Sequence, residues 1–311
     1  MKKTNIFLGN EICCGTYAFL NTVQDAGIDY KLFEITSTVP FGISHRKEED
    51  YSRLLTTYCD PNIGLDRAAE FWSYKQEKET FYNSKEAEKY ILDITKTNRC
   101  LVGPLDMEKL GYLILPNLYA NMDHYITIFR QSGELFCMDS EAIPVKRITR
   151  KELGRWLEVG NLPEAKGQIN VRSYTKSGCY SEKSRKKNAI SHSFKLIIKN
   201  LTESSEKRQG NYAIENCWQW LKEKPVEKWR LPFLYDVSFL IQRKMLQEYW
   251  QKLACELHLL NKDAAHEMES IIQKQIDVLG EMFHALQCER TIHEQDFSKL
   301  AELERNLIKQ V

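Results

Sequence analysis

Cys14 is a candidate nucleophile because of its place in the chain. It comes directly before residues 15–26, whose apolar spacing predicts a helix that stops at Gly27. A thiol at a helix N-terminus lies near unpaired backbone N–H groups and the positive end of the helix dipole, which favour the reactive thiolate. The backbone N–H of Cys14 can also help to hold an oxyanion. Taken alone, Cys14 fits a small buried residue at a helix start equally well.

His124 and Asp139 are candidates for a base and the carboxylate that orients it. His124 precedes the apolar run 125–129, Asp139 ends the run 135–138, and residues 131–134 between them are typical of a hairpin turn. Adjacent strands of a hairpin can bring the two side chains together, so that the carboxylate fixes the imidazole tautomer. Each residue alone fits a surface histidine or a turn aspartate. The order Cys, His, Asp on this scaffold predicts a catalytic triad and an acyl group carried as a thioester on Cys14.

The composition excludes several classes of function. The 311 residues carry a formal net charge of +1, so no global charge attracts nucleic acid or an anionic membrane. Nine scattered cysteines, an odd number without a C-x-x-C pair, predict reduced thiols and neither a disulfide framework nor a metal site. Residues 1–3 resemble the start of a signal peptide, but Asn5, Asn10 and Glu11 interrupt its apolar run. No apolar stretch reaches the roughly 18 residues of a membrane span. We therefore expect a cytoplasmic protein.

The pattern of the chain changes near residue 150, which predicts one domain over 1–150 and another over 151–311. The first mixes helical with strand-like segments and predicts an α+β fold; the segments are 15–26, 84–94, 100–103, 125–129 and 135–138. The second carries the apolar stripes of a helical bundle over 234–260, 263–286 and 297–307. Between them, the polar and basic stretch 172–188 predicts a loop.

Four stretches resemble the N-terminal domain of the butirosin biosynthesis protein H family. They are Cys14-Gly-Thr-Tyr-Ala-Phe-Leu with Gly27, Leu101-Val-Gly-Pro-Leu-Asp106, Asp123-His124-Tyr-Ile-Thr, and Met138-Asp139. The resemblance covers residues 1–150, and Val-Gly-Pro-Leu-Asp is its most distinctive motif. The layout of that family is similar to papain-like and bacteriocin-leader-processing cysteine peptidases. The resemblance therefore implies a papain-like N-terminal domain, followed here by a mostly α-helical domain.

The same resemblance implies an acyltransferase of antibiotic biosynthesis. Cys14 would be the nucleophile, His124 the base and Asp139 the orienting acid. The donor would be an acyl carrier protein thioester and the acceptor an amine of an aminoglycoside; in that family, a γ-glutamyl-4-amino-2-hydroxybutyryl group passes to ribostamycin. The enzyme itself would need no cofactor, because the donor brings phosphopantetheine on the acyl carrier protein.

Several positions depart from the expected pattern. Cys13 is a second thiol beside the nucleophile, although the spacing to Thr16, Ala18 and Gly27 favours Cys14. Ser140 follows Asp139 where relatives often have proline, which leaves Glu141 as an alternative third member. Papain-like enzymes often carry a glutamine where this chain has Leu8, so Asn10 is the predicted second oxyanion donor.

Charged residues suggest where the substrates bind. Asp106 and Asp123 are the predicted carboxylates for the ammonium groups of the acceptor, although Asp106 fits equally a cap on a short helix at 107–110. The carrier protein is expected to dock on Lys183, Arg185, Lys186 and Lys187, whose alternative is a solvated loop. The C-terminal helices fit a lid, a docking surface or a homodimer interface.

Two other classes of function fit the same residues. A cysteine peptidase or amidase would release the acyl group to water without an amine acceptor. A non-catalytic binding module would keep the fold with an unreactive Cys14.

Overall fold

The computed structural model describes residues 13–47, 52–55, 60–113, 122–140, 145–159, 162, 165–178, 181–202 and 210–311. These residues form two compact units. The sheet unit holds the described residues of 1–33 and 65–185, and the helical unit holds those of 34–64 and 186–311. The division therefore differs from the expected one at residue 150, and the chain passes between the units three times.

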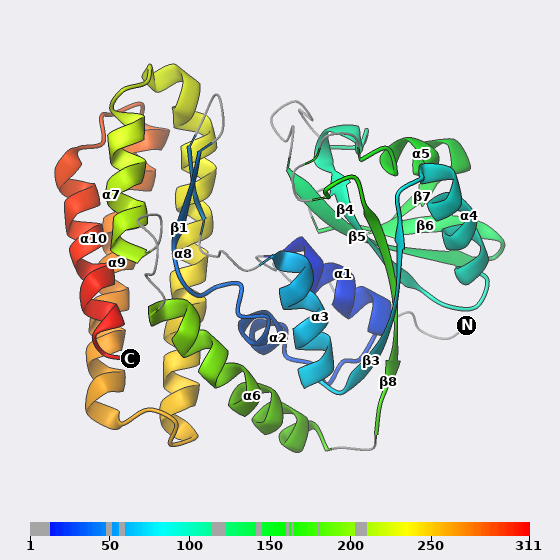
Figure 1. The fold of residues 1–311 in the computed structure, drawn as a ribbon, viewed down its shortest axis with the longest axis horizontal. Helices are drawn as coiled ribbons and strands as arrows, with labels where there is room; N and C mark the ends of the chain where they lie inside the picture. The colour runs from blue at the N-terminus through cyan, green and yellow to red at the C-terminus, as the bar shows by residue number, and fades with distance from the viewer. Residues whose placement is uncertain are drawn as a thin grey trace. The chain divides into compact units, whose positions relative to one another are not determined.

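A six-stranded antiparallel sheet forms the centre of the sheet unit (Figure 1). Its strands, in spatial order, are β3 (Tyr74–Phe81), β8 (Ile169–Lys176), β4 (Cys100–Asp106), β5 (Asp123–Gln131), β6 (Glu134–Met138) and β7 (Lys146–Ile148). β8 lies between β3 and β4 and pairs with both. Because this inner strand comes after residue 150, the sheet unit extends past the expected boundary.

Helices cover both faces of the sheet, and the alternation of side chains along β5 shows how. Ile126 and Ile128 pack in one core with α4 (Ser84–Ile94) and α5 (Arg150–Trp156). Thr127, between them, points to the other face and donates a 2.6 Å hydrogen bond to the carbonyl of Ala18 in α1 (Cys14–Val23). The sheet is therefore covered by helices on both faces, as expected of an α+β fold. The predicted hairpin of β5 and β6 is confirmed.

Two predicted helices are confirmed with small changes at their ends. α1 ends at Gln24, whose left-handed backbone (φ 52°) takes the place expected for Gly27. α4 is capped by Asn83, whose side chain accepts a 2.8 Å hydrogen bond from the N–H of Lys85. Two short helices complete the N-terminal half, α2 (Tyr30–Thr36) and α3 (Pro61–Phe71).

The prediction of a loop over 172–188 is wrong. β8 runs to Lys176, and α6 (Glu182–Thr202) begins six residues later. The charge of Arg172 suggested exposure, but its side chain is fully buried against Asp66 of α3. Because Arg172 pairs with Asp66, an inner strand of the sheet carries a charged residue, and its sequence is typical of a polar loop.

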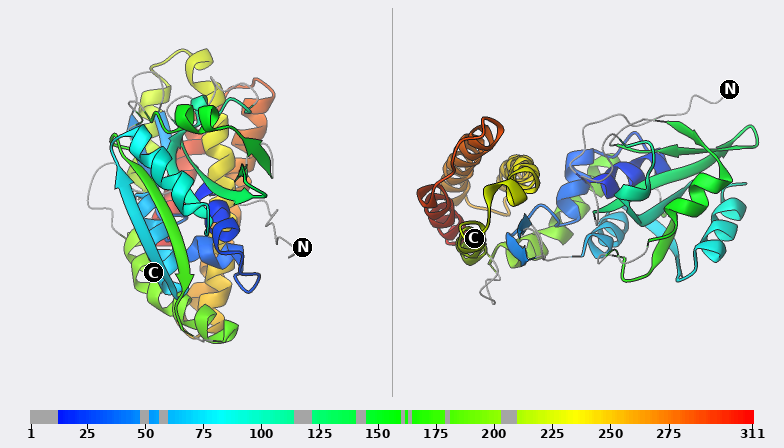
Figure 2. Two further views of the ribbon diagram at one scale, coloured as in Figure 1. Left: turned by 90° about the vertical axis from the view of Figure 1, so that its right-hand side faces the viewer. Right: turned by 90° about the horizontal axis from the view of Figure 1, so that it is seen from above.

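The helical unit confirms the predicted apolar stripes. α7 (Gly210–Leu221), α8 (Val226–Glu256), α9 (Lys262–Gln287) and α10 (Glu294–Ile308) enclose a common core. Figure 2 shows α8 and α9 running side by side. A hairpin of β1 (Ser44–Lys47) and β2 (Ser52–Leu55) joins this unit, where Leu54 donates its backbone N–H to Asp236 at 3.0 Å. No helix among the residues described is long and apolar enough to cross a membrane.

Candidate active site

His124 and Asp139 form a buried pair at one end of the β5–β6 hairpin. The register pairs Thr127 with Met138, which places His124 at the start of β5 and Asp139 just past the end of β6. Nε2 of His124 lies 2.7 Å from Oδ1 of Asp139, and the two residues are 1% and 2% exposed. With a proton on Nε2 donated to Asp139, Nδ1 is the nitrogen that would accept a proton from a nucleophile. The predicted contact is confirmed, and the catalytic roles stay predictions.

Tyr112 is a member of this site that the sequence did not suggest. Its hydroxyl donates to Oδ2 of Asp139, the oxygen that His124 does not use. Its ring packs edge-on against Trp156 of α5, with the ring centroids 5.3 Å apart. Two donors thus hold the Asp139 carboxylate, one on each oxygen. Tyr112 lies 27 residues before Asp139 in a turn, and no local pattern links the two.

Cys14 is the first residue of α1, one residue before the predicted helix start at Gly15, and is half-buried. Cys13 is the N-cap and makes no side-chain capping hydrogen bond. Gly15 lies against the ring of Tyr125, because a β-carbon on Gly15 would be 3.9 Å from Cδ2 of Tyr125. The residue after Cys14 therefore meets the residue after His124, at the N-terminal end of α1. The contact between the Cys14 sulfur and His124 stays a prediction.

The Gly103-Pro104 segment shapes the start of β5. Val102 pairs with Ile126 and Leu105 with His124, so β4 contains an extra residue that bulges opposite Tyr125. A β-carbon on Gly103 would collide with the Tyr125 ring and lie 2.8 Å from the carbonyl oxygen of His124. The distinctive motif thus has a structural part: glycine lets β4 approach the backbone that carries His124.

Asp106 and Asp123 are directly paired residues of β4 and β5. Oδ1 of Asp106 accepts a 3.1 Å hydrogen bond from the N–H of Glu108 and caps the short helix η1 (Met107–Lys109), so the capping alternative is confirmed. Asp123 is half-buried beside His124. Two acidic residues therefore lie opposite one another on neighbouring strands, next to His124.

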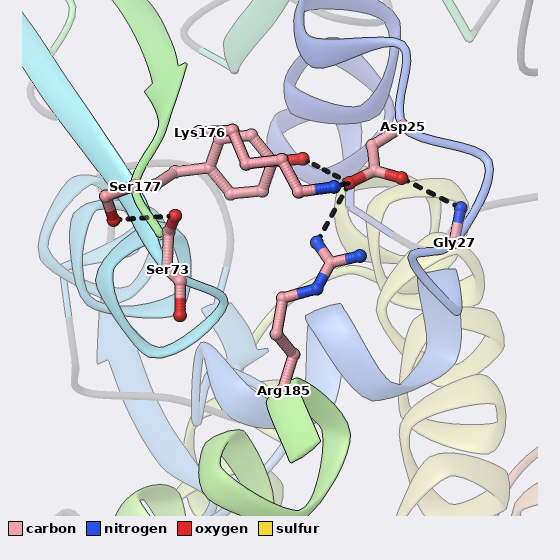
Figure 3. A network of polar contacts seen from close by, with 7 residues as sticks. Asp25, Gly27, Ser73, Lys176, Ser177 and Arg185 are labelled. Carbon is pink, nitrogen blue, oxygen red and sulfur yellow. Dashed lines mark hydrogen bonds and ion pairs between the residues drawn. The ribbon is translucent and has the colours of Figure 1, made fainter. Parts of the chain in front are cut away.

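Asp25 fixes the other end of α1 (Figure 3). Its carboxylate accepts hydrogen bonds from Tyr74 (2.7 Å), Lys176 (2.9 Å), Arg185 (2.8 Å) and the backbone N–H of Gly27 (3.0 Å). Burial alone would raise the pKa of Asp25, but these hydrogen bonds outweigh it and hold the pKa well below its usual value. α1 is thereby tied to β3, to β8 and to the first turn of α6.

The predicted docking residues have different surroundings. They lie on helix α6 and not on a loop; Lys183 and Lys187 are exposed and Lys186 is half-buried. Arg185 is buried in its ion pair with Asp25, so its side chain is not accessible to a docking partner. The predicted oxyanion donor Asn10 and the alternative acid Glu141 lie outside the described residues.

In the part of the chain that the structure describes, no three His, Cys, Asp or Glu side chains gather so that they could hold a metal ion. Comparison with known proteins finds no family model that matches the chain and no significant match among curated proteins.

Proposed function

We propose that this protein is an acyltransferase that carries its acyl group as a thioester on Cys14. The observation that supports this most directly is the buried pair of His124 and Asp139, whose side chains lie 2.7 Å apart at the start of β5. The residue after His124, Tyr125, packs against the first turn of α1. A carboxylate that orients a histidine beside a helix-terminal cysteine is the arrangement of a cysteine nucleophile with its base. The resemblance to the butirosin biosynthesis protein H family supports the same reading.

In the first half of the reaction, Cys14 takes the acyl group from the carrier. The thiolate attacks the thioester carbonyl, the backbone N–H of Cys14 faces the oxyanion, and the bond to the phosphopantetheine sulfur breaks. The departing thiolate takes the proton that His124 had accepted from Cys14. One thioester replaces another, so positioning rather than bond energy governs this step.

In the second half, a neutral amine of the acceptor attacks the acyl-enzyme. Nδ1 of His124 accepts the proton of the attacking nitrogen, the C–S bond to Cys14 breaks, and an amide forms. Asp139 stabilises the imidazolium while it exists, and Tyr112 keeps the carboxylate oriented. The paired carboxylates of Asp106 and Asp123 are the proposed site for the remaining ammonium groups, as an aminoglycoside would present.

Intact-mass measurement of the protein mixed with acyl-carrier thioesters tests this proposal. We expect the mass to increase by the acyl group, Cys14→Ala to abolish the increase, and Cys13→Ala to keep most of it. Loading on Cys13 alone would overturn the assignment. If water removes the acyl group from Cys14 as fast as an aminoglycoside does, a peptidase or amidase is favoured. If Cys14 neither accepts the acyl group nor reacts with an alkylating reagent, a binding module is favoured.

The acceptor site is tested by timing the two half-reactions separately. Asp106→Asn and Asp123→Asn should load normally but transfer to the amine more slowly. A charge-assisted hydrogen bond contributes about 1.5–3 kcal/mol, so the loss should reach about tenfold or more. Variants that load slowly and transfer normally would show that these carboxylates do not bind the acceptor.

A further inference from the structure

Arg172 places a positive charge in the interior of the sheet unit. It lies on the inner strand β8 and its side chain is 0% exposed. Nε of Arg172 donates to Oδ1 of Asp66 at 2.7 Å, and Nζ of Lys78 lies 2.8 Å from Oδ2 of the same carboxylate. Two cations thus share one anion, and this group of three side chains keeps a net charge of +1.

The contacts of α1 show which part of the helix lies over Arg172. At its C-terminal end, Asp25 binds Lys176 at 2.9 Å; further back, the rings of Phe19 and Tyr174 meet with centroids 4.8 Å apart. Two residues of strand span about 6.6 Å, which corresponds to about four residues of helix. Two residues before Tyr174, Arg172 is therefore level with the first turn of α1.

Tyr125 supports this placement independently. Its ring lies 3.9 Å from where a β-carbon of Gly15 would be, and it is also close enough to Arg172 for the two to interact electrostatically. Tyr125 therefore contacts the first turn of α1 and lies within electrostatic range of the buried guanidinium.

We propose that Arg172 is a positioning residue of the active site: a fixed buried charge that stabilises the thiolate of Cys14 through space. The proposal rests on Cys14 being the nucleophile. The helix dipole of α1 and the Arg172 charge act in the same direction, because both present positive potential to the sulfur. The other charged and titratable groups at this end come from the elements packed around it: His124 and Asp123 of β5, Asp106 of β4, and Asp66 and Arg67 of α3.

The expected effect depends on the sign of the charge removed. A unit charge about 10 Å away in a partly polarisable interior changes a pKa by about one. Arg172→Met should therefore raise the pKa of the Cys14 thiol by about one, and Arg172→Lys should largely restore it. Asp66→Asn removes the neutralising anion and should lower that pKa. Lys78→Gln, on a partly exposed side chain, should raise it by less.

The test is the rate at which iodoacetamide alkylates Cys14 as a function of pH, in the full-length Cys13→Ala protein. Mass spectrometry of the Cys14 peptide separates this thiol from the others. Opposite shifts for Arg172→Met and Asp66→Asn support the proposal. An unchanged pKa in folded Arg172→Met, or shifts in one direction for both variants, overturns it. If Arg172→Met does not fold, Asp66→Asn against Lys78→Gln makes the same comparison of signs.

This outcome is independent of the acyl-transfer test. The thiol pKa is measured without any carrier or acceptor. If acyl loading fails while the pKa shifts with charge as expected, the proposed function falls and the electrostatic role of Arg172 stands. If loading succeeds and the pKa does not respond, the reverse holds.

Discussion

The Asp139 carboxylate accepts hydrogen bonds on both of its oxygens, and this orients His124. His124 uses one oxygen and Tyr112 the other, so the carboxylate can neither rotate nor turn away without losing a hydrogen bond. Both partners are held elsewhere, His124 by strand pairing and Tyr112 by packing on Trp156. The orientation of the Asp139 carboxylate therefore depends on the pairing of β4 with β5 and on the packing of Tyr112 against α5.

Tyr112→Phe should slow acyl transfer while leaving the fold intact. The ring would still pack on Trp156, but Asp139 would lose the hydrogen bond that the Tyr112 hydroxyl donates. A hydrogen bond to a charged group contributes about 1.5 kcal/mol or more, so kcat/KM should fall by about tenfold. Tyr90→Phe, which removes a hydroxyl from α4, is the control and should keep the wild-type rate. A wild-type rate in Tyr112→Phe would mean that Asp139 is held without this hydroxyl.

Asp25→Asn should make the protein less stable at neutral pH, and the difference should shrink in acid. The folded state holds the pKa of Asp25 below its ordinary value, so the stabilisation is present above about pH 4 and is lost as the pH falls towards the folded pKa. Urea unfolding at pH 7, 4 and 3 measures this. Asp93→Asn, on an exposed helical ion pair, should change little at any pH. A constant difference between wild type and Asp25→Asn at all three pH values would contradict the role of the charge.

At the scale of elements, the site depends on how closely two strands and one helix approach. The bulge in β4 brings the Gly103 backbone against Tyr125, and Tyr125 in turn receives the first turn of α1. The bulge of β4 thus packs against β5, and β5 packs against the start of α1. A β-carbon added at Gly103 would push against Tyr125 and the backbone of His124, and through Tyr125 against the first turn of α1.

Gly103→Ala should destabilise the protein by about 1–3 kcal/mol and abolish most activity. The new β-carbon has no room beside the Tyr125 ring and the His124 carbonyl, so β5 must shift. Gly154→Ala, on helix α5, is the matched control in the same unit. Its β-carbon would meet only Oε2 of Glu88, at 3.5 Å. That variant should be as stable as wild type or slightly more so. Equal urea midpoints for the two variants would show that the close approach at Gly103 is not needed.

Charge reversal on α6 tests docking of the carrier. Lys183→Glu with Lys187→Glu should raise the apparent KM for the carrier-bound donor, and the effect should shrink with salt, because exposed charges are screened over about 10 Å at 0.1 M. Lys151→Glu, an exposed change on α5, is the control. Arg185→Glu is no test, because it would place a buried anion against Asp25. An unchanged KM would leave α6 as a solvated helix.

At the scale of the whole molecule, each unit holds a fully buried cation, Arg172 in the sheet unit and Lys244 in the helical unit. In the helical unit, Lys244 of α8 lies 2.7 Å from Glu304 of α10, and Gln275 of α9 donates to the same oxygen at 2.7 Å. Each residue comes from a different helix. The cluster therefore fixes how three helices are aligned, at the cost of desolvating two charges.

Removing one partner of this cluster should harm stability more than removing all three. Lys244→Ala leaves Glu304 as an unpaired buried charge and should cost about 3–5 kcal/mol. The triple variant Lys244→Met, Gln275→Leu and Glu304→Leu should be within about 2 kcal/mol of wild type, or more stable. Urea unfolding compares them. A triple variant less stable than Lys244→Ala would show that the cluster stabilises the bundle by its own interactions.

The sequence predicts those parts of the molecule whose signal is local. The stripes of α8, α9 and α10 are continuous along the chain, and the β5–β6 hairpin with His124 and Asp139 is set by one turn. Three features depend on distant partners and were missed. Arg172 can occupy an inner strand because its side chain pairs with Asp66, Tyr112 reaches Asp139 only in the folded state, and residues 34–64 belong to the helical unit.

The position of β8 also sets the order in which this protein can take shape as it is synthesised. Until the ribosome has passed residue 176, β3 lacks its neighbour and β4 has one open edge, because β8 fills the place between them. The nascent chain therefore carries two unfinished edges for some 70 residues after β4, a state in which strands pair with the wrong partners.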